Sequence, residues 1–455
     1  MILKLLALNV VVMLGVFALV QAIIVAIYCR YMRPVLATKP WHSSDSCAVL
    51  MALRGADPHL YRTLLAHLQQ RDVAFHLHLI VDSANDPAVA VIRQLPTDLA
   101  HRWTMHVLEI DSDHCSLKCL ALAQVARRLL LEAGRPKFFA FADGDGLVSQ
   151  DWLWRLLEPM APWNQESSSM TTTVGATTGH RWYRCFPAKE LSSPPVTTAE
   201  SADERSQISF GAIVRYFWNL GSLPQMHLYR VVWGGSWAIR ADVLEHCGLL
   251  ESWQKALFED TQVRTFVEAA GHRVVTAPGV LVQSYEPLRV ASATRWISRQ
   301  LLDMRLYHPS FRWTAFHAGF LALLHACILG IAIWASLLQD WWSLGVVIMS
   351  LMGYQLFYLI VWRNIERTAQ HCLSQLSFEQ PIQRETSGSA AHVFWAATGL
   401  LLTQVVYPFA TVRAILTRTV AWRGIHYRID SPTQIKRLNY EPFQTDPTET
   451  RSDSL

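Results

Sequence analysis

The feature that most constrains the fold is a run of apolar residues near the start of the chain. Residues 5–28 are almost entirely Leu, Val, Ala, Ile and Phe. A helix of this length can cross the hydrocarbon core of a bilayer, which is about 30 Å thick. The run is longer than the core of a secretory signal peptide, and no small-residue cleavage site follows it. We therefore expect residues 1–33 to form an uncleaved N-terminal membrane anchor.

Three further apolar stretches lie near the C-terminus, at residues 315–338, 342–362 and 391–412. Hydrophobic residues make up 51% of the chain and charged residues only 17%, which is too apolar for an ordinary soluble enzyme. The net charge of +4 comes from scattered basic residues, so no nucleic-acid partner is expected. The sequence predicts a multi-pass membrane protein with C-terminal membrane helices within residues 312–412.

Basic residues predict which side of the membrane each loop occupies. Lys4 precedes the first apolar run, whereas Arg30, Arg33 and Lys39 follow it. Because basic loops remain in the cytoplasm, the region after the anchor is expected to be cytoplasmic. The turn between the second and third stretches contains Asp340 and no basic residue, so it belongs on the opposite side.

The last apolar stretch is ambiguous because it contains Thr403, Gln404 and Pro408. If it crossed the membrane, the basic tail after it would lie outside, against the charge rule. We favour a re-entrant or interfacial segment and leave a complete span open. Residues 413–455 are then a basic cytoplasmic tail with a disordered polar end.

Between the membrane segments, residues 45–310 alternate between apolar strands and amphipathic helices. The expected strands are residues 47–52, 76–81, 105–110 and 138–142. Such alternation predicts an α/β domain with a mostly parallel sheet and helices on both faces. Ligands bind these sheets at the carboxyl ends of the strands, and Arg54, Asp82 and Asp143 follow such ends. No G-x-G-x-x-G or Walker loop is present.

The sequence Phe-Ala-Asp-Gly-Asp places Asp143 and Asp145 directly after the fourth strand. Two carboxylates at a strand end can hold a hard cation such as Mg²⁺ or Mn²⁺ against phosphate oxygens. The alternative is a plain turn, for which Asp-Gly-Asp is also suited. Asp111 and Asp113 form a competing pair, but the longer context favours the pair at 143 and 145.

A second acidic motif, Phe-Glu-Asp, ends at Asp260 and opens a helix over residues 261–270. An acid at this position can simply complement the helix dipole. However, the glycine-hinged loop 234–240 precedes it and is suited to close approach of a substrate. A carboxylate about twenty residues later can reach the same cleft and accept a proton.

Two basic-aromatic stretches complete the candidate site. Residues 295–300 begin an amphipathic helix that is either interfacial or carries Arg295 and Trp296 at the mouth of the site, and both can hold together. The run 175–183 ends in His-Arg-Trp-Tyr, which suits contact with a sugar or a lipid headgroup or forms an ordinary edge strand.

These motifs, in this order, resemble the family 2-like inverting glycosyltransferases of the GT-A fold. The likeness is closest to the ceramide glucosyltransferase branch, which includes bacterial hopanoid-associated members. It covers residues 45–310, the membrane layout, and the Trp-Arg-Gly-Ile-His-Tyr segment at 422–427. The resemblance implies a Rossmann-like GT-A domain in the cytoplasm, with transmembrane helices before and after it.

The resemblance also implies residue roles. The nucleotide sugar is expected to bind Arg54, Asp82, Asp86, Lys118, Asp143, Arg295 and Trp296. A divalent cation, Mg²⁺ or Mn²⁺, is expected at Asp143 and Asp145. The acceptor is expected beside Gly234, Gly235 and Ser236, and Asp260 matches the catalytic base.

The chain departs from the family's (Q/R)-x-x-R-W motif, because Ser292 stands at the first position. Processive polysaccharide synthases usually keep Gln there. The resemblance therefore implies a membrane-bound inverting transferase that moves one sugar from a nucleotide sugar, with a UDP-sugar as the expected donor, to a sphingolipid-, hopanoid- or glycerolipid-like hydroxyl. A processive polysaccharide synthase and a non-catalytic membrane protein with a degenerate transferase domain remain the alternatives.

Overall fold

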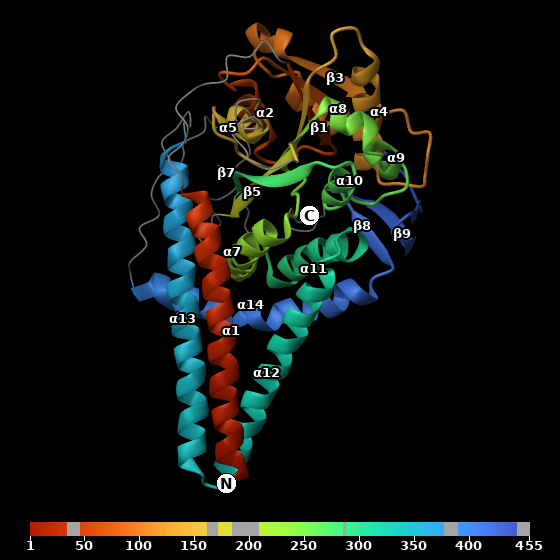
Figure 1. Ribbon diagram of the computed structural model, residues 1–455. Helices are drawn as coiled ribbons and strands as arrows, with labels where there is room; N and C mark the ends of the chain where they lie inside the picture. The colour runs from red at the N-terminus through yellow and green to blue at the C-terminus, as the bar shows by residue number, and fades with distance from the viewer. Residues whose placement is uncertain (34–45, 162–171, 184–208, 285–287, 377–389, 444–455) are drawn as a thin grey trace, which may run out of the picture.

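An α/β domain sits at one end of a bundle of long helices (Figure 1). The structure is a computed structural model and describes residues 1–33, 46–161, 172–183, 209–284, 288–376 and 390–443. The predicted disordered end of the tail therefore lies mostly outside the described residues.

A seven-stranded sheet forms the centre of the domain, with the strand order β3-β2-β1-β4-β6-β5-β7. Strands β1 (Cys47–Leu53), β2 (Phe75–Val81), β3 (Trp103–Val107) and β4 (Phe138–Ala142) run parallel. These four strands confirm the predicted parallel half of the sheet. The third strand begins two residues earlier than expected and ends at Val107, because it pairs with β2 only over that range.

Strand β6 (Ser236–Arg240) lies between β4 and β5 (Val174–Tyr183) and runs antiparallel to both. Strand β7 (Arg273–Ser284) is the edge strand beside β5 and runs parallel to it. The register between β4 and β6 pairs Ala142 with Ser236. The carboxyl end of β4 therefore meets the amino end of β6. This reversal brings the acidic pair and the glycine loop, which lie far apart in sequence, to one edge of the sheet.

Helices cover both faces of the sheet. Helices α2 (Leu60–Leu68), α3 (Pro87–Ile92) and α5 (Trp152–Leu157) share one core with Val49 and Met51. The other core receives the alternate strand residues and is covered by α4 (Leu117–Leu131), α8 (Ala241–His246), α9 (Leu249–Trp253) and α10 (Val263–Ala269).

Short 3₁₀ turns at Thr97–Arg102 and Glu158–Met160 complete the connections. In the second core Phe141 stacks on Trp237 with ring centres 4.1 Å apart. Burial on both faces explains why the central strands β1 and β4 are apolar throughout.

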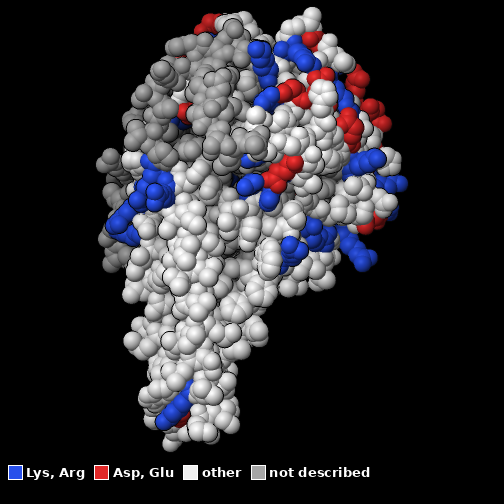
Figure 2. Space-filling view, viewed as in Figure 1, with Lys and Arg blue, Asp and Glu red and all other residues white. Residues whose placement is uncertain are grey.

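Four helices within the described residues are long and apolar enough to cross a membrane: α1 (Ile2–Met32), α12 (Phe311–Leu337), α13 (Trp341–Ser374) and α14, which runs from Ala390 to Leu416. They indicate a membrane protein. Figure 2 shows that the bundle formed by the first three is almost free of charged side chains between its far tip and the end that meets the domain. A surface of this kind suits contact with lipid.

Helix α14 runs across the long axes of α1, α12 and α13, beneath α7 (Phe210–Tyr229) and α11 (Val290–Tyr307) (Figure 1). Its two faces differ in what they contact. One face is buried and includes Leu400, Tyr407, Ala410 and Ala414, whereas the other exposes Phe394, Leu401, Val405, Phe409, Val412 and Leu416. Because α14 lies across the other long helices and exposes an apolar face, it fits the interfacial segment predicted from the sequence.

Specific hydrogen bonds fix the domain to the bundle. Tyr31, near the end of α1, donates from its hydroxyl to the Thr276 carbonyl at 2.7 Å. Trp362 on α13 donates from Nε1 to the Tyr216 hydroxyl on α7 at 2.9 Å. The domain is therefore held directly against the membrane helices.

The residues after α14, which were predicted to be a basic tail, form a three-stranded antiparallel sheet. Its strands are β8 (Thr419–Trp422), β9 (Ile425–Ser431) and β10 (Gln434–Arg437). Buried and exposed residues alternate along β9, as expected for a sheet that rests one face on the domain.

We predict that Gly399→Leu displaces α14 from α7. A Cβ at Gly399 would lie 2.1 Å from Ile213 Cγ2, so a larger side chain forces the two helices apart. Overpacking of this kind costs about 1–3 kcal/mol. The apparent Tm of the detergent-solubilised protein should fall by several degrees. Gly330→Leu on α12, where nothing lies within 4 Å, is the control, and equal Tm values for the two variants would contradict close packing at Gly399.

Candidate active site

One pocket gathers the carboxyl ends of β1, β2 and β4, the loop before β6, the start of α4, one face of α11 and the β8–β9 turn. Twelve charged residues line it. Its carboxyl groups are Asp57, Asp82, Asp143, Asp145, Glu259, Asp260 and Asp303. Its cationic groups are Arg54, Lys118, Arg181, Arg299 and Arg423. Because the acids outnumber the bases, the pocket suits a ligand that arrives with positive charge or with a cation.

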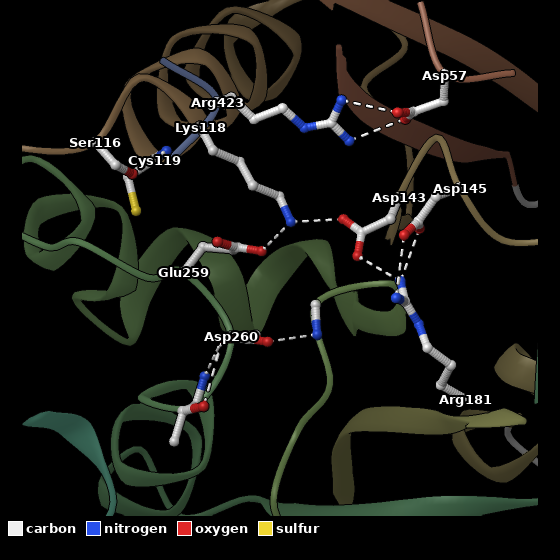
Figure 3. A network of polar contacts seen from close by, with 12 residues as sticks. Asp57, Ser116, Lys118, Cys119, Asp143, Asp145, Arg181, Glu259, Asp260 and Arg423 are labelled. Carbon is white, nitrogen blue, oxygen red and sulfur yellow. Dashed lines mark hydrogen bonds and ion pairs between the residues drawn. The ribbon is translucent and has the colours of Figure 1, made fainter. Parts of the chain in front are cut away.

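The acidic pair stands at the centre of a chain of ion pairs (Figure 3). Lys118 Nζ lies 2.7 Å from Asp143 Oδ1, and Arg181 contacts Asp145 through two nitrogens, at 2.7 and 3.1 Å. Arg181 also reaches Asp143 Oδ2 at 3.3 Å. Burial alone would raise the pKa of Asp143, but Lys118 and Arg181 outweigh it and hold that pKa below its usual range. The Asp143 carboxylate is thus available as an anionic oxygen ligand.

Glu259 is the second partner of Lys118, with an Nζ to Oε1 distance of 2.5 Å. Its side chain is only 3% exposed. Burial raises the pKa of Glu259 to about 7, although the Lys118 ammonium opposes this shift. Lys118 therefore joins α4, the end of β4 and the segment before α10 into one polar network.

Asp260 is oriented by backbone and hydroxyl donors. The Gly234 amide donates to its Oδ2 at 2.5 Å, and the Thr261 amide donates to its Oδ1 at 2.8 Å. A Cβ at Gly234 would lie 2.8 Å from Asp260 Oδ2 and 2.5 Å from Glu259 Oε1, so only glycine permits this approach. The glycine loop thus holds the carboxylate predicted to be the base. Gly235, next to it, packs against the Trp233 ring and does not line the pocket.

Helix α11 presents Trp296, Arg299 and Asp303 to the pocket, at the spacing of one helix face. Asp303 is buried and accepts a hydrogen bond from the Thr261 hydroxyl at 2.7 Å. Burial first, and the neighbouring Asp260 charge second, raise the pKa of Asp303 well above its usual value. Arg295 faces away from the pocket and donates to Ser292 Oγ at 2.9 Å.

The predicted nucleotide-binding residues at β1 and β2 divide into two groups. Arg54 and Asp82 line the pocket and form an ion pair with each other. Within the described residues, Asp82 Oδ1 is buried and has no hydrogen-bond partner. Asp86 does not line the pocket. Both of its carboxylate oxygens lie 3.0 Å from the Gly55 amide, which donates a hydrogen bond to them, and its side chain caps the start of α3.

The predicted acceptor-side loop is also split by the structure. Gly234 lines the pocket, whereas Ser236 is fully buried and accepts a hydrogen bond from Trp152 Nε1 at 2.8 Å. The Ser236 side chain therefore belongs to the packed interior and does not line the pocket.

Sequence reasoning did not single out five of the pocket's charged residues: Asp57, Glu259, Arg299, Asp303 and Arg423. For Arg299 and Asp303 a signal existed, since they follow Trp296 at helical spacing. Arg181 was noted only as part of a basic-aromatic strand, and its pairing with Asp145 depends on β5 lying two strands from β4.

Asp143 and Asp145 fit a divalent cation by their chemistry. Their carboxylate oxygens are hard donors, and each side chain is 27% exposed towards the pocket. Within the described residues no cluster of three or more His, Cys, Asp or Glu is arranged as a metal site. The pair would therefore supply only part of a coordination shell and leave the remaining positions to ligand oxygens and water, as Mg²⁺ and Mn²⁺ accept.

Fold and site together define a membrane-associated α/β protein with a carboxylate-rich ligand pocket at the strand ends. The chain belongs to glycosyl transferase family 21, whose family model matches residues 10–184 and 225–435. It is thus a glycosyltransferase. Membership of this family, together with the observed sheet and membrane helices, confirms the predicted GT-A fold class.

Solved structures with a similar arrangement have low sequence identity to the chain. The mannosyltransferase PcManGT from Pyrobaculum calidifontis, in complex with GDP-Man and Mn²⁺, is 12% identical with a TM-score of 0.43 and covers 91% of this chain and 99% of its own. S. aureus TarS 1–349 with UDP-GlcNAc is 10% identical with a TM-score of 0.32, over 87% and 100% of the two chains. No curated protein matches the chain.

We predict that removing divalent cations abolishes sugar transfer. The diphosphate of a donor would lie beside the adjacent carboxylates Asp143 and Asp145, so it needs a metal between them to bind productively. Activity should disappear in EDTA and return with Mn²⁺ or Mg²⁺. Asp145→Ala should raise the Mn²⁺ concentration required or abolish activity. Asp111→Ala, from the exposed competing pair, is the control, and greater sensitivity at Asp111 would move the metal site there.

Proposed function

We propose that the chain is a membrane-bound inverting glycosyltransferase, similar to ceramide glucosyltransferases. It transfers one sugar from a nucleotide sugar, of which a UDP-sugar is the best candidate, to the hydroxyl of a membrane lipid. One observation carries this proposal: Asp260 and the acidic pair Asp143–Asp145 line the same pocket, and α11 forms the side of that pocket nearest the membrane helices.

The donor side of the site would lie at the ends of β1, β2 and β4. Asp82, with its unpartnered buried oxygen, can accept a hydrogen bond from a base or ribose donor. Lys118 and Arg181 lie beside the acidic pair and can neutralise phosphate oxygens. A divalent cation held by Asp143 and Asp145, when bound, would stabilise the departing diphosphate.

Asp260 would act as the general base. The Gly234 and Thr261 amides fix the direction of its carboxylate, so its position does not depend on the substrate. It would accept the proton of the acceptor hydroxyl while the oxygen attacks the anomeric carbon from the face opposite the leaving diphosphate. That geometry inverts the configuration at the anomeric carbon.

Buried Asp303 supports this base indirectly. Burial raises its pKa well above the usual value and so favours its neutral form. Its carboxyl group also shares the Thr261 hydroxyl with Asp260, at 2.7 and 3.4 Å. A neutral neighbour avoids the repulsion that a second charged carboxylate would exert on Asp260.

A lipid acceptor would approach along the membrane surface. The exposed apolar face of α14 lies beneath α11, and Trp296 on α11 lines the pocket above it. The lipid tails can therefore remain in the apolar layer while the hydroxyl reaches Asp260. With basic loops kept in the cytoplasm, the catalytic domain would face the cytoplasm.

We expect Asp260→Asn to lower turnover at least about 10²-fold, the low end for loss of a general base. Asparagine keeps the size of the side chain and one acceptor oxygen, but it cannot take the proton and cannot accept from both the Gly234 and Thr261 amides. The apparent Tm should therefore fall modestly, whereas UDP affinity should remain close to that of the parent protein. Transfer from radiolabelled nucleotide sugars to membrane lipid extracts would be measured at matched protein levels. Asp242→Asn, which is exposed on α8, is the control. Near-normal turnover of the Asp260 variant would remove it from the mechanism.

The product should be a lipid that carries one sugar. Helix α11, which lines the pocket, packs on α14, which exposes an apolar face, and Ser292 replaces the Gln that processive synthases usually keep. Label from the nucleotide sugar should extract into chloroform–methanol and migrate as a single glycolipid on thin-layer plates. Label recovered instead in water-soluble polymer of high molecular mass would favour the processive synthase.

A further inference from the structure

The C-terminal sheet is fixed to the α/β domain beside the pocket. Its inward residues Ile425, Tyr427, Ile429 and Ile435 are buried in the core that also contains α4. The Leu117 amide, at the start of α4, donates to the Tyr427 hydroxyl at 3.3 Å. Helix α4 carries Lys118, so the sheet is anchored to the same element that supplies this lysine to the site.

The β8–β9 turn reaches into the pocket and contains only Arg423 and Gly424. Trp422 pairs with Ile425 across it, and both turn residues have positive φ, 49° and 75°. This is the geometry of a type I′ hairpin turn, whose first position is most often Asn, Asp or Gly. An arginine in the left-handed region is uncommon and unfavourable, so a gain elsewhere has to offset it.

Arg423 is held in the pocket by an end-on ion pair. Its Nη1 and Nη2 donate to the two Asp57 oxygens, each at 2.9 Å, and Nη1 also donates to the Arg54 carbonyl at 3.1 Å. Figure 3 shows its guanidinium directed at Asp57, with Lys118, Asp143 and Asp145 below it. Burial alone would lower the pKa of Arg423, but the charges of Asp57, Asp145 and Asp143 are near enough to raise it. Its side chain is 23% exposed.

These contacts leave one edge of the guanidinium available. An arginine has five N–H donors, and three are used by Asp57 and the Arg54 carbonyl. Within the described part of the chain, Nε–H and one Nη2–H have no protein acceptor. Two parallel N–H groups on one edge match two oxygens of a phosphate group.

Arg54 holds the turn in this position. Its Nε donates to the Arg423 carbonyl at 2.8 Å, its Nη2 donates to the Glu441 carbonyl at 2.7 Å, and its Nη1 pairs with Asp82. The Phe443 ring packs on Gly55. Arg54, which the sequence reading assigned to the nucleotide, is thus engaged in fixing the C-terminal segment against the ends of β1 and β2.

We propose that the β8–β9 turn is part of the donor site, with Arg423 binding the terminal phosphate of the nucleoside diphosphate through its free edge and Asp57 orienting it. The proposal rests on the proposed function, because it places a donor diphosphate between Arg423 and the acidic pair. The C-terminal sheet is then a wall of the donor site, and the chain after the membrane helices takes part in binding.

The test compares nucleotides that differ by one phosphate. UDP and UMP affinities are measured in Mn²⁺ by calorimetry on the full chain in detergent. Arg423→Ala should weaken UDP binding about 10- to 100-fold, as expected for loss of a charge-assisted contact. It should change UMP binding less than about twofold, because UMP lacks the phosphate that Arg423 contacts. Arg423→Lys should give an intermediate UDP affinity, since lysine keeps the charge but loses the paired donors.

Arg428→Ala is the matched control, because Arg428 lies on the same sheet, is half exposed and forms a surface ion pair with Asp430 at 3.2 Å. It should leave both affinities unchanged. Equal loss of UDP and UMP binding in Arg423→Ala, or a lowered Tm with unchanged UDP affinity, would show that Arg423 only supports the fold and would overturn the inference. If the unaltered protein binds no nucleoside diphosphate, the proposed function itself fails, whereas normal binding by Arg423→Ala would reject this inference alone.

Discussion

The ion pairs of the partly buried Lys118 ammonium are the interactions on which the rest of the site depends. Lys118 lies between Asp143 and Glu259, and these three residues come from α4, the end of β4 and the segment before α10. Removing one member of such a buried group leaves an uncompensated charge, at a typical cost of about 3–5 kcal/mol. The network therefore fixes three separate segments at the positions that the acidic pair and Asp260 require.

The antiparallel strand β6 determines which motifs meet. A fully parallel continuation of the sheet would have placed the glycine loop at the opposite edge from Asp143. Because Ser236 pairs with Ala142, the Gly234 amide instead lies within hydrogen-bond distance of Asp260, near the acidic pair. A side chain at Gly234 would collide with both Glu259 and Asp260. The glycine thus serves the close approach of two carboxylates to a backbone amide, in addition to any contact with an acceptor.

The membrane helices and the C-terminal sheet complete the site from outside the α/β domain. Helix α14 packs its small and aromatic residues under α7 and α11 and turns an apolar face outward. The chain then returns as β8–β10 to the ends of β1 and β2, where Arg54 and Arg423 connect the two parts. Membrane attachment and the ligand pocket are therefore structurally continuous, which suits an enzyme whose acceptor would lie in the bilayer.

The sequence alone determined the parts of the molecule that depend on local chemistry. Unbroken apolar runs predicted the membrane helices, because a backbone in lipid must satisfy its own hydrogen bonds. Alternating strands and helices predicted the parallel half of the sheet and the strand-end position of Asp143. The tertiary structure decided what depends on contacts between distant segments. It pairs Arg181 with Asp145, and it folds the basic tail into a sheet that carries Arg423. It also turns Arg299 and Asp303 into the pocket, whereas Arg295 faces away. Such pairings are set by strand order and helix rotation, which local composition does not encode.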